Sequence, residues 1–244
     1  MPDLTTDVLI IGGGVAGRSA AIFTARHGLE TTVVTAGSPL LARNAHLENY
    51  PGFPAGVNSR QLLELMGDQL TRVGAAVEHA EVAELRRGPE AFRAETASSG
   101  TVSSGSVIAA TKNTVEYLTP LDGVEILDRG KSFVETDGRG RTGVDGLYAA
   151  GRLAQKPHQA VVAAGHGAEV AVTLLEDREE PFYHDWVAPT GYFTGRDREV
   201  PPGCEEIEET ERRRRERASM DTIQEAFADP HPDQPEQHPS VAND

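Results

Sequence analysis

The chain has 244 residues, a formal net charge of −15 and 38% hydrophobic residues, which suffices for one large domain with a polar remainder. This acidity excludes a generally basic nucleic-acid binder, and the single cysteine excludes a disulfide framework and an internal Cys-x-x-Cys redox pair. Only three of the 23 basic residues are lysines, and such a surface favours a halophilic source, because high salt screens acidic self-repulsion. The alternative is an ordinary acidic cytosolic protein.

The N-terminal sequence MPDLTTD has no basic segment, and no later window approaches about 18 consecutive apolar residues. We therefore expect a soluble, cytoplasmic protein with no membrane partner and no nucleic-acid partner.

Residues 8–17 read VLIIGGGVAG, a short apolar run followed by glycines at positions 12, 14 and 17. In a dinucleotide fingerprint, Gly12 would make the tight turn, Gly14 would leave room for a pyrophosphate, and Gly17 would let the next helix pack closely. The helix N-terminus would then favour the anion. The alternative reading is a glycine-rich turn in another α/β domain.

Residues 30–35 predict a second parallel strand, which completes a β-α-β unit. In the NAD version of this unit an acidic residue follows the second strand, but here Thr35 and Ala36 occupy that place. Their identity disfavours a nicotinamide cofactor in this site.

Residues 47–57 are rich in Pro and Gly and predict an ordered loop, followed by a helix that is capped by Ser59 and ends at Gly74. Three further segments then predict a small antiparallel meander whose last strand returns to the central sheet: 76–82, 92–97 and 101–110.

The C-terminal third predicts a helix over 157–176, an aromatic segment after Pro181 that packs the extension onto the domain, and a helix over 205–218. In the last helix, glutamates precede arginines by four residues, which favours a self-neutralised, solvated helix over a nucleic-acid patch. Cys204 is a poor nucleophile candidate because the adjacent glutamates would raise its pKa. Residues 229–244 predict a disordered acidic tail.

Together the fingerprint, the loop LENYPGFPAGV with its helix, the strand VIAAT, and the blocks GVDGLYAAG and HQAVVAAGHGAEVA resemble the thioredoxin reductase family over about residues 5–178. The resemblance implies a Rossmann-like α/β FAD-binding domain with a parallel central sheet and a small antiparallel three-stranded flap. The predicted organisation is an FAD domain over 1–180, a helical extension over 181–228 and the tail.

The resemblance also implies which residues contact FAD: the fingerprint for the pyrophosphate, Asn49 for the flavin, Val82 for the adenine side, and Gly151 with the segment from His158 for the ribityl chain and isoalloxazine. The complete predicted cofactor site is Gly12, Gly14, Ala16, Gly17, Thr35, Ala36, Asn44, Asn49, Val82, Thr111, Lys112, Gly151, Arg152, His158, Gln159 and Ala160. No metal site is predicted.

The chain departs from the family in three ways. About a dozen residues, near 112–124, stand where family members carry a nicotinamide-binding domain, and the redox cysteines are missing with it. Lys112 replaces a usual glycine, and Arg152 replaces a usual aspartate. Either these two cations reach the pyrophosphate, or loss of the aspartate removes a ribityl hydrogen bond and weakens FAD binding.

These observations predict a single-domain FAD-dependent oxidoreductase that is not itself a dithiol reductase. Its electrons would come from free NAD(P)H or a carrier protein and pass to an unknown acceptor, and a homodimer stays open. A non-catalytic FAD-binding or regulatory module acting through a protein partner is the alternative, and an NAD-binding domain is disfavoured. His158 is either a surface residue or a proton carrier at the flavin edge.

Overall fold

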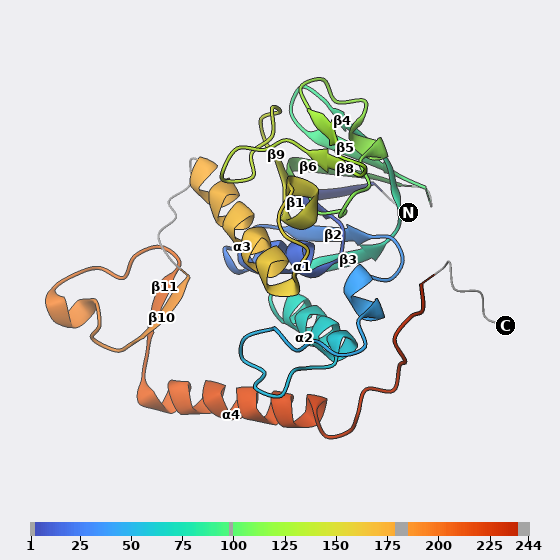
Figure 1. The fold of residues 1–244 in the computed structure, drawn as a ribbon. Helices are drawn as coiled ribbons and strands as arrows, with labels where there is room; N and C mark the ends of the chain where they lie inside the picture. The colour runs from blue at the N-terminus through green and yellow to red at the C-terminus, as the bar shows by residue number, and fades with distance from the viewer. Residues whose placement is uncertain (1–2, 98–99, 179–184, 239–244) are drawn as a thin grey trace. The chain divides into compact units, whose positions relative to one another are not determined.

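The computed structural model describes residues 3–97, 100–178 and 185–238 (Figure 1). The chain divides into two compact units, the first comprising Met1–Leu174 with the chain from Asp233, and the second comprising Leu175–Pro232. The first stretch ends at Leu174, and the boundary at residue 180 lies outside the described residues and stays a prediction.

The first unit is an α/β body. Its elements in chain order are β1 (Leu4–Ile11), α1 (Val15–Arg26), β2 (Thr31–Thr35), η1 (Leu40–Arg43), α2 (Ser59–Arg72), β3 (Ala76–His79), β4 (Val82–Arg87), β5 (Phe92–Thr96), β6 (Gly100–Ala109), η2 (Glu116–Leu118), β7 (Ile126–Asp128), β8 (Ser132–Val134), β9 (Leu147–Ala149), η3 (Gly151–Ala154) and α3 (Ala160–Asp177), which runs into the second unit.

The central sheet has the strand order β3-β2-β1-β6-β5-β4, and β9 also pairs with β6. Strands β3, β2, β1, β6 and β9 are parallel, whereas β4 and β5 continue from β6 as an antiparallel flap. This topology confirms the predicted Rossmann-like α/β fold with a parallel sheet and a three-stranded flap.

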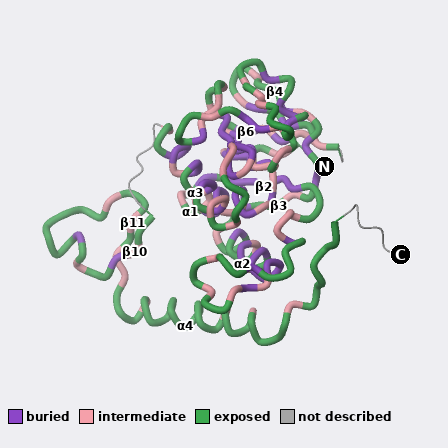
Figure 2. The backbone as a smooth tube through the Cα atoms, viewed as in Figure 1, coloured by how far each residue is buried: buried purple, intermediate pink, exposed green. Residues whose placement is uncertain are grey.

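The sequence of β1 explains why it lies in the middle of the sheet. Its residues 8–11 are all apolar and at most 3% exposed, and every residue of β2 is buried as well. Such continuous apolar or β-branched runs are typical of parallel strands that are covered on both faces. Figure 2 shows the buried positions concentrated in this sheet and in α1, α2 and α3.

Two sequence predictions about local pairing were wrong. The segment 76–82 does not form one flap strand, because β3 pairs in parallel with β2 and the flap begins only at Val82. The N–H of Ala80 donates to the carbonyl of Thr35 at 3.1 Å, which holds the chain on β2 up to that point. After the flap, the family resemblance also implies a return strand near 124–127, but this segment forms the short β7, which pairs with β8 in a separate hairpin.

Helix starts also differ from the predictions. The cap of α2 is Asn58, whose side chain accepts the N–H of Arg60, while Ser59 donates to the carbonyl of Asn44. Helix α3 begins at Ala160 rather than 157, because the N–H of Gln159 donates to the carbonyl of Pro157 in a preceding turn.

The second unit contains β10 (Trp186–Pro189), η4 (Thr194–Arg196), β11 (Cys204–Ile207) and α4 (Glu209–Ala226). The helix predicted from 205 therefore starts later and extends further, because residues 204–207 pair in parallel with β10. The described aromatic side chains contact one another: the ring centroids of Trp186 and Tyr192 lie 4.6 Å apart.

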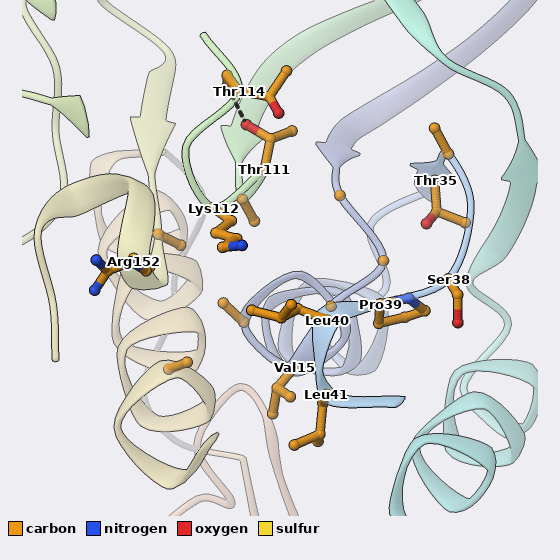
Figure 3. Close-up of a pocket in the computed structure, with 18 of the residues that line it drawn as sticks. Val15, Thr35, Ser38, Pro39, Leu40, Leu41, Thr111, Lys112, Thr114 and Arg152 are labelled. Carbon is orange, nitrogen blue, oxygen red and sulfur yellow. Dashed lines mark hydrogen bonds between the residues drawn. The ribbon is translucent and has the colours of Figure 1, made fainter. Parts of the chain in front are cut away.

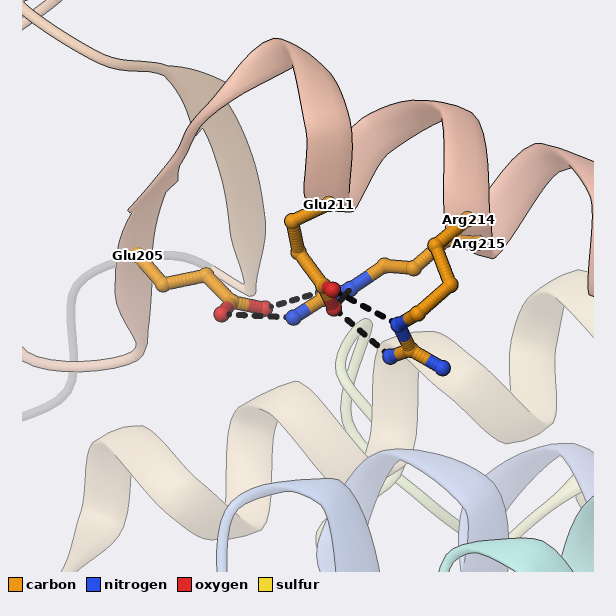
Figure 4. Close-up of polar contacts among 4 residues, drawn as sticks. All are labelled: Glu205, Glu211, Arg214 and Arg215. Carbon is orange, nitrogen blue, oxygen red and sulfur yellow. Dashed lines mark hydrogen bonds and ion pairs between the residues drawn. The ribbon is translucent and has the colours of Figure 1, made fainter.

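Helix α4 has no buried residue and is covered with ion pairs. Glu211 accepts hydrogen bonds from Arg214 and Arg215, and Arg215 also reaches Glu205 (Figure 4). These pairs agree with the predicted self-neutralised helix.

The segment after residue 229 is described as far as residue 238. There the Nε of Arg60 donates to the carbonyl of Asp233 at 3.1 Å. The disorder expected over 229–244 stays a prediction. Among the described helices, none is long and apolar enough to cross a membrane.

Candidate cofactor site

A cavity of about 740 Å³ lies where β1, β2, β6 and β9 end, so the segments that follow these strands line it (Figure 3). Strand β1 lies between β2 and β6, so the strand order of the sheet reverses at β1. Such a switch point is where α/β sheets bind ligands. The volume falls within the range of roughly 300–1,000 Å³ that is usual for cofactor sites.

Most of the predicted cofactor residues meet in this cavity. Fourteen of the sixteen line it, and only Gly17 and Gly151 do not: the lining residues are Gly12, Gly14, Ala16, Thr35, Ala36, Asn44, Asn49, Val82, Thr111, Lys112, Arg152, His158, Gln159 and Ala160.

The glycines of the fingerprint have distinct positions. Gly12 adopts a φ of 115°, which the turn out of β1 requires and which favours glycine. A Cβ at Gly17 would lie 1.9 Å from the carbonyl oxygen of Gly12, so this glycine serves the close approach of α1 to the strand. Gly14 caps α1, and a Cβ there would meet no atom within 4 Å. The structure therefore leaves open space beside the helix N-terminus, as a bound pyrophosphate requires.

Gly151 lies behind the cavity wall instead of in it. Its N–H donates to Nδ1 of His166 at 2.9 Å, which fixes the start of η3 against α3. Burial, and secondarily Lys156, lowers the pKa of His166 to about 4, so this ring is neutral at neutral pH.

The Pro-rich loop over residues 47–57 and the start of α3 form another part of the cavity wall. The side-chain amide of Asn49 donates to Oε1 of Gln159 at 2.9 Å. Leu47 and Val57 exchange two backbone hydrogen bonds that close the loop at its base. Two segments that are 110 residues apart in sequence are thereby held together at the cavity.

Charged residues in the lining are mostly cationic: they are Arg43, Lys112 and Arg152, with Glu81 as the one acid, and the titratable His158 lies among them. The pKa of Lys112 is lowered by burial and by repulsion from neighbouring cations, and the pKa of His158 is lowered for the same two reasons. Nε of Arg152 is buried with no hydrogen-bond partner among the described residues. This arrangement suits an anionic ligand.

A hydrogen-bonded group supports the loop after β6. The hydroxyl of Thr111 donates to the carbonyl of Thr114 at 2.6 Å and lies 3.0 Å from the hydroxyl of Tyr117. Burial raises the pKa of Tyr117, so it stays protonated. These contacts hold Lys112 at the cavity.

Sequence reasoning missed Arg43, which lines the cavity, and Arg18, which does not line it but supports the fingerprint loop. Arg43 lines the cavity from η1 and lies 3.9 Å from Glu236. Arg18 donates from Nε to the carbonyl of Gly13 at 2.8 Å and from a terminal nitrogen to the carbonyl of Leu63. The only sequence signal for Arg18 was its place one residue after the fingerprint, on a helix face that is otherwise apolar. Among the residues that the structure describes, no group of three or more His, Cys, Asp or Glu is placed to hold a metal.

Comparisons with known proteins agree with the geometry. The FAD binding domain family matches residues 7–46. Thioredoxin reductase of Rickettsia felis is 35% identical over 120 residues, which are 48% of this chain and 38% of that protein. Thioredoxin reductase of Listeria monocytogenes is 33% identical over 129 residues, 52% of this chain and 40% of that protein. The chain thus matches less than half the length of these curated relatives.

A solved thioredoxin reductase from Gloeobacter violaceus has the same fold, with a TM-score of 0.66 and 18% identity, covering 74% of this chain and 98% of that one. The open space beside Gly14, at the N-terminus of α1, fits the pyrophosphate of a dinucleotide. The chain therefore carries a thioredoxin reductase-like FAD-binding domain.

Proposed function

We propose that the chain is an oxidoreductase that works with one FAD-binding domain and exchanges electrons with a separate donor and a separate acceptor. The observation that carries this proposal is one continuous cavity that joins the fingerprint at α1 to the first turn of α3. FAD, when bound, supplies the two-electron transfer chemistry, and the protein supplies binding, orientation and electrostatics.

The chain's own residues have separable tasks in this proposal. The first turn of α1 offers unpaired N–H groups and the positive end of a helix dipole to the pyrophosphate. The first turn of α3 reaches the cavity through Ala160 and Ala163 and would stabilise negative charge on the isoalloxazine in the same way. Asn49 and Gln159, which are hydrogen-bonded to each other, would together orient the ring edge.

His158 lines the cavity just before the start of α3. Its pKa is lowered, first by burial and then by Arg152 and Lys112, so the ring is neutral at neutral pH. A neutral imidazole offers one N–H donor and one acceptor nitrogen, and it can therefore hold or pass a proton at the cavity.

A separate donor is proposed because the interval between β6 and β7 is short. It runs from residue 110 to residue 125 and contains a single turn of helix, η2. A β-α-β unit needs about 30 residues, so this interval cannot hold a nicotinamide-binding domain. Free NAD(P)H or a carrier protein would deliver the electrons.

The test is an absorption spectrum of the purified protein in molar salt, followed by anaerobic titration with NADH, NADPH and a reduced carrier protein. Bound FAD that is reduced and reoxidised at useful rates is the expected result. A protein that takes up no FAD would refute the proposal, and bound FAD that no donor reduces would favour the non-catalytic module. Retention of FAD in molar salt but loss of FAD in dilute buffer would support the proposed halophilic origin.

A further inference from the structure

The cationic side chains of the cavity gather at one end. Figure 3 shows Thr35 and Ser38 at one side of the cavity and Arg152 at the other, with Lys112 between them. Lys112 follows β6, Arg152 belongs to η3, and His158 precedes α3. Three different segments therefore bring positive or protonatable groups to the part of the cavity that the resemblance assigns to the ribityl chain and isoalloxazine.

These cations lack counter-ions. Among residues 3–97, 100–178 and 185–238, neither Lys112 nor Arg152 forms an ion pair. The guanidinium of Arg152 lies 5.5 Å from the ring centroid of Phe133, and its buried Nε has no acceptor. Arg43 differs, because Glu236 lies 3.9 Å from it. Buried donors normally have an acceptor, so Nε of Arg152 is arranged for one that the chain itself does not provide. Lys112 is exposed and lines the same cavity.

The backbone of Lys112 gives independent support. Its φ is 66°, in the left-handed region that favours glycine, and only Gln155 and Asp197 share this feature among the described non-glycine residues. A lysine held in an unfavourable backbone conformation at the wall of a cavity indicates a task for its side chain. Burial lowers the pKa of Lys112 and of His158, and repulsion from Lys131 and Arg152 lowers both further, so cationic groups are crowded together here.

The fingerprint already provides for the phosphates of the cofactor, through the first turn of α1 beside Gly14. We infer that Lys112, Arg152 and His158 form a receiving site for a small anionic substrate, one bearing a carboxylate or phosphate group, beside the flavin. This inference rests on the proposed function, because the anion would react with the flavin that this function requires. A small molecule is favoured over an acidic protein surface because the three side chains line a cavity.

The test uses calorimetric titration of inorganic phosphate and of malonate into the FAD-loaded protein in a low-chloride buffer. In the FAD-loaded protein the pyrophosphate of FAD would occupy the fingerprint, so binding of a further anion reports the site formed by Lys112, Arg152 and His158. Saturable binding is expected, weakened at least about tenfold in Lys112→Gly and in Arg152→Gln. Arg93→Gln on β5 removes the same charge from an exposed position and should leave the affinity unchanged.

Lys112→Gly separates a binding role from a structural one. Because glycine suits a φ of 66°, this variant should melt at the same temperature as the parent or higher. Weaker anion binding in a variant of undiminished stability is therefore not a folding defect. Visible-spectrum perturbation of the flavin by malonate, lost in the same variants, would place the anion beside the ring.

Three outcomes would overturn the inference: no anion binding by the parent protein, unchanged affinity in both variants, or loss of FAD affinity by tenfold or more in the variants. The last result would mean that these cations hold the phosphates of the cofactor. The same titrations are made on flavin-free protein. If the parent takes up no FAD yet binds phosphate through Lys112 and Arg152, the proposed function fails and the anion site is supported.

Discussion

The imidazole of His166 on α3 accepts the backbone N–H of Gly151 at 2.9 Å, and only 4% of this residue is exposed. The bond requires that Nδ1 carries no proton, so the neutral ring has its proton on Nε2, which has no partner among the described residues. This contact ties the helix that closes one side of the cavity to the segment after β9.

Acidification should therefore weaken the fold through His166. Its pKa of about 4 in the folded state lies below the unfolded value of about 6.5, so the unfolded chain binds more protons between these limits. Stability contributed by the neutral ring is complete above pH 6.5 and is lost as the pH falls toward 4, by about 1–2 kcal/mol after allowance for solvent screening. Denaturant unfolding across this pH range measures the effect.

The matched variant is His166→Asn, because an asparagine oxygen can accept the N–H of Gly151 without titrating. Between pH 6.5 and pH 4, the free energy of unfolding of this variant should no longer show the decrease that is assigned to protonation of His166. An unchanged pH profile in this variant would contradict the role assigned to the imidazole.

A side chain at Gly14 should remove FAD without harming the fold. The position has an ordinary φ of −76°, and a Cβ would meet no protein atom within 4 Å, so Gly14→Ala should melt like the parent. The added methyl would enter the space expected for the pyrophosphate, and Gly14→Val would fill more of it. Equilibrium dialysis with FAD should show at least about a hundredfold weaker binding for valine.

The contrasting variant is Gly17→Ala. There the methyl would lie 1.9 Å from the carbonyl oxygen of Gly12, so the expected loss is in thermal stability. Retained FAD in Gly14→Val would mean that the fingerprint does not hold the cofactor.

The parts of the fold that the sequence predicted are those with local patterns. The apolar run of β1, the glycines after it and the helical spacing of α2 each depend on neighbouring residues, and each prediction was correct within a few residues. The parallel pairing of β3 with β2 was missed because it depends on a partner strand about 45 residues away. Strand propensity alone does not distinguish parallel from antiparallel neighbours.

The candidate site was predicted in the same uneven way. Fourteen lining residues followed from motifs and resemblance, but the left-handed backbone of Lys112 did not, since a lysine gives no local signal for it. His166 was hidden in an apolar helical pattern, and its partner is 15 residues away. Both features arise only when separate loops meet around the cavity.

The carboxylate of Glu206 should determine the structure of the loop after β10. It accepts the N–H groups of Gly191, Phe193 and Thr194, and also the hydroxyl of Thr194. Desolvation raises its pKa, but these hydrogen bonds outweigh desolvation and lower the pKa to about 2. The loop should therefore keep this stabilisation above the ordinary pKa near 4.5 and lose it as the pH falls toward 2.

Glu206→Gln should speed amide exchange of Gly191, Phe193 and Thr194, roughly tenfold or more, because the amide replaces a charged acceptor. Glu205→Gln is the control, since Glu205 pairs with Arg215 on α4 instead of with the loop. Equal exchange rates in both variants would rule out the loop-organising role.

The protein should not reduce thioredoxin with NADPH, even when FAD is bound. Its curated relatives are thioredoxin reductases, but this chain has one cysteine, so no pair of thiols can relay electrons within it. The 16 residues from 110 to 125 also leave no room for a nicotinamide-binding domain.

A coupled assay with thioredoxin and a disulfide dye should give the rate of the flavin-free control. Turnover at roughly 1–1,000 per second, the usual range of enzymes, would show that the missing cysteine pair is dispensable or supplied by a partner. Replacement of Cys204 by serine would then decide whether the lone thiol takes part, because a rate that survives this change must use thiols from another molecule.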